Sequence, residues 1–158
     1  MNTPTERLSS AIRIGGVTVR IHASDPAFLR MVDDRYDGFT GDWASSDCEF
    51  TVDLTAPGKP VSADGDLRVW RDDDLWKLER GDFAAAWDPL SRRGRIRQSA
   101  NPYSIDSVLR IVHTLILADS GGGLLLHAAS AVRNGRAFCF AGVSGAGKTT
   151  ISRLAPRT

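Results

Sequence analysis

Apolar and polar residues alternate over much of the first hundred positions, which is the period of strands with one buried face. The clearest stretch is 48–54, where apolar side chains at every second position alternate with acidic and hydroxyl side chains. Alternation also occurs at 12–14 and 17–21, on either side of Gly15-Gly16, and predicts a hairpin. Further strands are predicted at 67–70, 75–78, 83–87 and 94–98.

Two stretches have helical spacing instead. Ser24-Asp25-Pro26 precedes a short apolar stripe at 28–32 and predicts a capped helix that ends near Tyr36-Asp37-Gly38. Pro102 precedes a longer stripe at 105–116, which predicts a helix that ends at the glycines 121–123.

The last third of the chain contains one more hairpin pattern. The apolar stretch 124–132 predicts a buried strand, Asn134-Gly135 predicts a two-residue turn, and 137–141 predicts a buried return strand. A helix is expected from about 150 to 154. The pattern as a whole predicts an α/β or α+β chain, with a β-rich module containing one helix at 1–100 and a second domain at 101–158.

Composition excludes few classes of protein. The chain has 158 residues, is 42% hydrophobic and 25% charged, and has a formal net charge of +1, so bulk charge indicates neither nucleic acid nor an anionic membrane as a partner. No apolar run approaches the roughly 20 residues of a membrane span. We expect a cytoplasmic protein in which Cys48 and Cys139 are buried, reduced thiols.

Two runs of charge have a structural and a functional interpretation. The run Asp72 to Asp74 fits a solvated turn better than a cation site, because adjacent carboxylates on an extended chain point in alternating directions. The basic cluster Arg92, Arg93, Arg95 and Arg97 fits a solvated strand face, with an acidic partner or a phosphate as the alternative.

The strongest chemical signal is the stretch 142–149, which matches the phosphate-loop pattern G-x-x-x-x-G-K-[ST] without a mismatch. Gly142, Gly145 and Gly147 allow successive backbone N–H groups to point inward and hold phosphate oxygens. Lys148 is expected to reach the β- and γ-phosphates of ATP, and the Thr149 hydroxyl to ligate Mg²⁺. The remaining predicted nucleotide-binding positions are Val143, Ser144, Ala146 and Thr150.

The stretch from Leu124-Leu125-Leu126-His127-Ala128-Ala129 through the Asn-Gly turn to the loop resembles the HPr kinase/phosphorylase-related family. The resemblance covers roughly 105–154 and is loose before that. It implies a nucleotide domain like that of phosphoenolpyruvate carboxykinases, and ATP- and Mg²⁺-dependent phosphorylation of a hydroxyl, often a serine of a protein or peptide. The family has a histidine on the strand before the loop, and His127 has the matching spacing. A site-lining role for His127 and a structural role in the core remain equal alternatives.

The family's catalytic aspartate lies on a later strand, and only residues 150–158 follow the Lys-Thr pair here. We therefore expect a fragment or a prematurely ended copy of a longer protein, with association through unpaired strands as an open question. Two alternatives remain: an ATP-binding or regulatory module without chemistry, and the start of a transporter-type (ABC) ATPase. The histidine and the preceding helix disfavour the transporter type, as does the lack of its other motifs.

Overall fold

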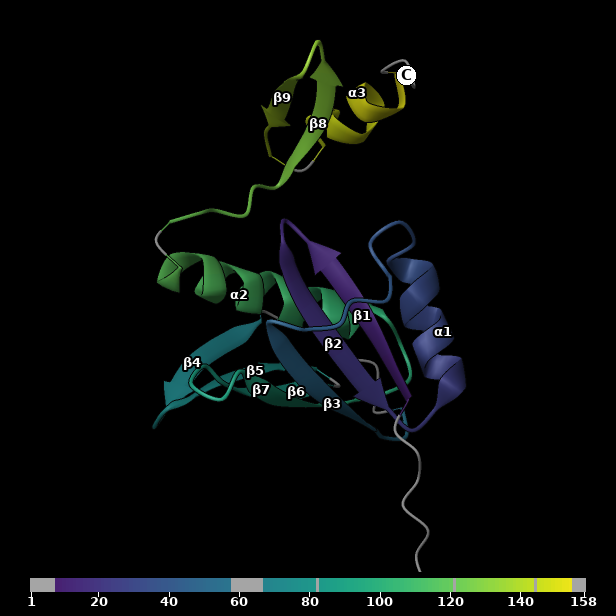
Figure 1. The fold of residues 1–158 in the computed structure, drawn as a ribbon, viewed down its shortest axis with the longest axis vertical. Coiled ribbons are helices and arrows are strands. Elements are labelled where there is room, and N and C mark those ends of the chain that lie inside the picture. Colours follow the sequence, from purple (N-terminus) through teal and green to yellow (C-terminus); the bar gives the residue numbers. More distant parts are fainter. Residues whose placement is uncertain (1–7, 58–66, 82, 121, 144, 155–158) are drawn as a thin grey trace, which may run out of the picture. The chain divides into compact units, whose positions relative to one another are not determined.

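The computed structural model describes residues 8–57, 67–81, 83–120, 122–143 and 145–154, and these residues have an α+β fold (Figure 1). The fold consists of a seven-stranded mixed sheet, a two-stranded sheet and three helices. The chain divides into two compact units, 1–113 and 114–158, and helix α2 (Tyr103–Asp119) crosses this division. The sequence-based domain boundary after residue 100 stays a prediction.

The large sheet has the order β1-β2-β3-β7-β6-β5-β4. Strands β2 and β3 are parallel, as are β3 and β7, whereas every other neighbouring pair is antiparallel. The strands are β1 (Leu8–Ile14), β2 (Val17–Ala23), β3 (Cys48–Leu54), β4 (Arg68–Asp72), β5 (Leu75–Arg80), β6 (Phe83–Asp88) and β7 (Arg93–Gln98).

The predicted strands and hairpins of this sheet are confirmed. Gly15 and Gly16 join β1 to β2 with φ angles of +58° and +85°, the left-handed conformation that a tight two-residue hairpin requires. Asp73 and Asp74 form the β4–β5 turn, and Asp72 is the last residue of β4. The Asp72 carboxylate lies 3.9 Å from Lys77, and the Asp74 carboxylate lies 3.5 Å from Arg71.

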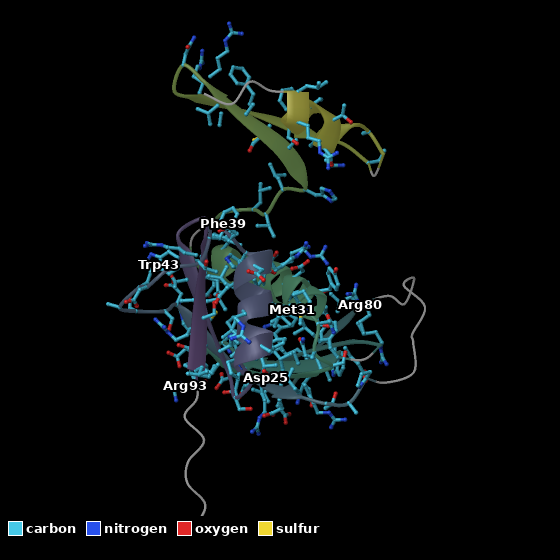
Figure 2. All side chains as sticks on the ribbon, turned by 90° about the vertical axis from the view of Figure 1, so that its right-hand side faces the viewer. Asp25, Met31, Phe39, Trp43, Arg80 and Arg93 are labelled. Atoms are coloured by element: carbon cyan, nitrogen blue, oxygen red, sulfur yellow. The ribbon has the colours of Figure 1, made fainter. Side chains whose placement is uncertain are left out.

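Two helices cover the sheet. Figure 1 shows α2 running across the strands and α1 (Pro26–Arg35) beside β1 and β2. The predicted cap of α1 is confirmed, because the Asp25 carboxylate accepts hydrogen bonds from the backbone N–H groups of Ala27 (2.8 Å) and Phe28 (3.4 Å). Asp25 lies at one end of α1 in Figure 2. The largest fully buried apolar side chains are those of Ile12, Val19, Ile21, Phe28, Val32, Phe50, Leu78, Phe83, Ile96, Ile105 and Val108.

The opposite face of the sheet is polar. Arg93, Arg95 and Arg97 follow one another at alternate positions of β7, and all three are exposed; Arg93 lies at the surface (Figure 2). The Arg95 guanidinium forms a 2.8 Å ion pair with Asp53 of the neighbouring strand β3. This arrangement favours the solvated strand face that the sequence indicated.

A carboxylate joins the two helices. Asp106, in the first turn of α2, accepts hydrogen bonds from the Tyr36 hydroxyl at 2.5 Å and from Arg35 Nη2 at 2.7 Å. The Arg35 guanidinium also lies over the Tyr103 ring, 5.5 Å from its centroid. Burial and the bond to Asp106 raise the pKa of Tyr36 above its usual value, so the phenol stays protonated and keeps donating.

Replacing Asp106 with alanine is expected to destabilise the protein by about 1–3 kcal/mol, because the half-buried Tyr36 hydroxyl loses its charged acceptor. Urea unfolding followed by circular dichroism measures the change. Asp119→Ala, which removes a carboxylate from the last turn of the same helix, is the control and is expected to have little effect. Equal effects of the two variants would contradict a specific role for Asp106.

The second unit contains β8 (Ala128–Arg133), β9 (Arg136–Ala141) and α3 (Lys148–Leu154). The predicted turn is confirmed, with φ angles of +52° at Asn134 and +71° at Gly135. Helix α3 packs against β8 (Figure 1). Helix α3 begins two residues before the predicted start at 150. Pro156, which by its residue type is expected to stop this helix, lies outside the described residues.

The prediction of two buried strands in this unit is wrong in part. Residues 124–127 are not in a strand, and the side chains of Leu124, Leu125 and Leu126 are 69%, 43% and 59% exposed. Strand β9 exists as predicted, but all six of its residues are exposed. Apolar character along the chain indicated burial, whereas burial requires a second layer that covers the strand.

The prediction of two buried thiols is also wrong in part. Cys48 is buried in β3, but Cys139 of β9 is exposed. Burial raises the pKa of the Cys48 thiol to about 12 from its usual value of 9.0. The stability gained from keeping this thiol protonated is present in full below pH 9 and is lost as pH rises towards 12.

In the native protein at pH 8, we therefore expect Cys139 to react with a thiol-specific disulfide reagent and Cys48 not to react. The thiolate is the reactive form, and Cys48 is both protonated and shielded from the reagent. Absorbance titration should give one fast equivalent before denaturation and two after it. Loss of the fast equivalent in Cys139→Ser is the control, and fast labelling of Cys48 in that variant would contradict the prediction.

Candidate nucleotide-binding loop

The predicted phosphate loop lies between β9 and α3. Strand β9 ends at Ala141 and helix α3 begins at Lys148, so the strand, loop and helix follow one another in the predicted order. Of the predicted binding positions, Ser144 lies outside the described residues. Gly142, Val143, Gly145, Ala146 and Gly147 are in the loop itself, while Lys148, Thr149 and Thr150 form the first turn of α3.

Two of the three glycines of the loop have the left-handed backbone conformation that favours glycine. Gly145 and Gly147 have φ angles of +84° and +82°. Residues with a Cβ atom adopt such angles only at a cost in conformational energy. Between these two glycines, the N–H of Ala146 donates to the carbonyl oxygen of Val143 at 3.2 Å and closes a tight turn. Alternation of left-handed and ordinary residues is the geometry that turns successive N–H groups to one side of a loop.

Lys148 is bound to the start of the same loop. Its Nζ donates hydrogen bonds to the carbonyl oxygens of Gly142 at 2.8 Å and Val143 at 2.9 Å, and the residue is half-buried. The ammonium group is thereby fixed across the loop rather than extended into solvent. The sequence motif predicted that this lysine binds phosphate, but it gave no sign that the lysine also holds the two ends of its own loop together.

The first turn of α3 carries the two threonines. Both Thr149 and Thr150 are exposed, and the Thr149 carbonyl accepts a hydrogen bond from the Ser152 hydroxyl at 3.0 Å. The first N–H groups of any α-helix lack an acceptor within the helix. The exposed Thr149 hydroxyl and these N–H groups are therefore available to a ligand that lies over the loop.

His127 lies directly before β8 and is exposed, so it is neither part of the strand nor a buried core residue, as a structural role would require. The β8–β9 register ends at the pair Ala128 and Ala141, and the N–H of Ala128 donates to the carbonyl oxygen of Leu126 at 3.1 Å, so the chain turns at His127. His127 thus follows the turn that leads into β8, one residue before the pair that precedes Gly142. Exposure disfavours the role in the core, and the site-lining role of His127 stays a prediction.

The charge around the loop favours an anionic ligand. Positions 120–158 contain five basic residues and no Asp or Glu, which gives +5 − 0 = +5 for this part of the sequence. The basic residues are Arg133, Arg136, Lys148, Arg153 and Arg157. The near-neutral charge of the whole chain conceals this asymmetry, because the acidic residues all lie at or before Asp119.

The protein offers few groups to a metal ion here. Three or more His, Cys, Asp or Glu side chains do not gather as metal ligands anywhere in the described residues. A Mg²⁺ ion at the loop would depend on the Thr149 hydroxyl and on oxygen atoms of the ligand, which is how this ion is often held at phosphates. Within the part of the chain that the structure describes, no helix has both the length and the apolar character of a membrane span.

Comparisons with protein-family models, with curated proteins and with solved structures give no match to this chain.

Proposed function

We propose that the second unit binds the triphosphate of Mg-ATP at the loop between β9 and α3. The observation that carries the proposal is the fixed position of Lys148, whose ammonium group lies over a loop with left-handed glycines at Gly145 and Gly147. A cation held beside inward-turned N–H groups is suited to a phosphate chain. The charge of +5 over residues 120–158 adds a field of the same sign.

We propose one role for each of these residues. Backbone N–H groups of the loop would hold the phosphate oxygens, and Lys148 would neutralise charge at the β- and γ-phosphates. Thr149 would supply one hydroxyl ligand to Mg²⁺. The exposed side chain of His127, directly before β8, would line the site and hydrogen-bond a phosphate.

The reaction we propose is transfer of the γ-phosphoryl group to a serine or another hydroxyl, as the resemblance to HPr kinase-related proteins implies. The finer fold, a nucleotide domain like that of phosphoenolpyruvate carboxykinases, is part of the same proposal. Such transfer also needs a carboxylate that accepts the proton of the attacking hydroxyl. Residues 120–158 contain no carboxylate side chain, so we expect this part of the chain by itself to bind ATP with little or no phosphotransfer.

A non-catalytic ATP-binding module is the second candidate, and the same lack of Asp and Glu after Asp119 favours it. Both candidates require nucleotide binding, and they differ in whether a carboxylate from elsewhere completes the site. Robust phosphotransfer by the purified chain would exclude the non-catalytic module.

Isothermal titration calorimetry of the purified chain with ATP, ADP and AMP, each with and without Mg²⁺, tests the proposal. We expect ATP to bind more tightly than AMP, since the contacts of Lys148 and Thr149 are to the outer phosphates and to Mg²⁺. Equal binding of the three nucleotides, or none by a protein whose circular dichroism shows it to be folded, would refute it.

A further inference from the structure

The seven-stranded sheet ends at β4 in the described part of the chain, and β4 lies at one edge of the sheet in Figure 1. All five residues of β4 are exposed, including Trp70, which is 38% exposed. In an antiparallel pair, alternate residues direct their N–H and C=O groups to opposite sides. The groups of β4 that do not face β5 are therefore directed away from the sheet, where they can pair with another strand.

The sequence of β4, Arg-Val-Trp-Arg-Asp, complements itself when two copies run antiparallel. A two-fold axis at Trp70 places each Arg68 opposite the Asp72 of the second copy, and it does so twice. Trp70 then meets its own counterpart at the centre. Opposite charges and paired aromatic rings are the cross-strand neighbours that stabilise antiparallel strands.

The register with β5 shows that these three residues share one face. Arg68, Trp70 and Asp72 pair with Glu79, Lys77 and Leu75 of β5. Across the sheet, Lys77 pairs with Ala86, and Ala86 pairs with the exposed Arg95 of β7. Paired residues lie on the same face, so the side chains of Arg68, Trp70 and Asp72 lie on the polar face. Val69, by contrast, pairs with the buried Leu78 on the face that the helices cover.

From this complementarity we propose that β4 is a dimerisation edge, at which two copies of the chain join into one continuous sheet about a two-fold axis at Trp70. All five residues of the strand overlap in this register. An axis one residue later, at Arg71, would place two like charges directly opposite each other, which is destabilising. Within one copy, Arg68 and Asp72 lie 3.9 Å from Glu79 and Lys77 and are 74% and 63% exposed, so both can contact a second partner.

Charge reversal at the two ends of β4 tests the proposal with the full chain. Sedimentation equilibrium of the wild type is expected to show a reversible dimer. Arg68→Asp and Asp72→Arg are each expected to weaken dimerisation at least about tenfold, because each places like charges opposite at both ends of the pair. Arg93→Asp makes the same change of charge on the same face, away from the edge, and is expected to leave the dimer intact.

Mixing the two reversed variants provides the decisive measurement. In a mixed pair, the Arg68→Asp copy has an acidic side chain at both ends of β4, and each lies opposite a basic side chain of the Asp72→Arg copy. The mixture should therefore dimerise although neither variant does so alone. The double variant R68D/D72R should dimerise as well, although both of its altered side chains then face like charges within their own copy. Loss of stability alone cannot produce this rescue, and thermal unfolding by circular dichroism checks that every variant folds.

A cross-link measures the position of the axis independently. In a Cys139→Ser background, Trp70→Cys places two thiols opposite each other across the axis, and oxidation should give a disulfide-linked dimer. Val69→Cys lies opposite Arg71 of the second copy and should give none. A wild type that stays monomeric at all concentrations, association that charge reversal does not change, or a mixture that does not recover would each overturn the proposal.

Discussion

Replacing Lys148 with alanine is expected to weaken the binding of Mg-ATP roughly 10- to 100-fold. In the proposed site the lysine would supply charge-assisted hydrogen bonds to phosphate, and each such bond contributes about 1.5–3 kcal/mol. The substitution also removes the two bonds from Nζ to the carbonyls of Gly142 and Val143, which fix the start of the loop. Calorimetric titration with Mg-ATP measures the dissociation constant for both proteins.

Arg153→Ala is the matched control for this prediction. Arg153 lies in the last turn of the same helix, so the variant loses the same charge at the other end of α3. We expect at most a small change in affinity, from the general field alone. Equal losses in the two variants would show that only bulk charge holds the nucleotide, and unchanged binding in Lys148→Ala would remove the loop from the proposed function.

Replacing Gly94 with alanine is expected to destabilise the seven-stranded sheet by about 2–4 kcal/mol. Gly94 of β7 pairs with Phe50 of β3, whose fully buried ring lies over the glycine. A Cβ atom at this position would lie 2.2 Å from the Phe50 ring and 2.8 Å from the carbonyl oxygen of Ala86. The carbonyl belongs to the neighbouring strand β6 and cannot turn aside, so the sheet itself must shift. Urea unfolding followed by tryptophan fluorescence measures the loss.

Two further variants identify the cause of this loss. Gly41→Ala also creates a close contact, at 2.9 Å, but its neighbour is the half-exposed ring of Trp43, which can move; we expect less than about 1 kcal/mol. Phe50→Leu removes the ring, so Gly94→Ala should cost about 1 kcal/mol less in that background. Additive costs would contradict a clash between the two side chains.

Local sequence patterns were sufficient to predict the strands, helices and turns of this protein. Alternation at 48–54 predicted β3, Asp25-Pro26 predicted the start of α1, and Asn134-Gly135 predicted the turn between β8 and β9. These features depend on side-chain period, capping and left-handed backbone angles, which neighbouring residues decide. The position and order of the strand, loop and helix around 142–149 were predicted for the same reason.

Burial could not be predicted in the same way. The apolar stretches at 124–126 and in β9 have the composition of buried strands, yet they are exposed. Cys139, within β9, is exposed for that reason, whereas Cys48 in the similar strand β3 is buried under the helices. Whether an apolar strand is buried depends on what packs against it, and this is a property of the tertiary structure.

The sequence by itself determined which segments form strands and helices, where the chain turns, and which eight residues match the phosphate-loop pattern. Only the tertiary structure decided that β3 lies between β2 and β7, that Asp106 joins two helices, and that Lys148 binds its own loop. It also decided that β4 ends the sheet in the described residues and that Gly94 faces Phe50. The physical reason is range: conformation and capping depend on residues a few positions apart, whereas pairing and packing join side chains far apart in the chain, for which local patterns carry no signal.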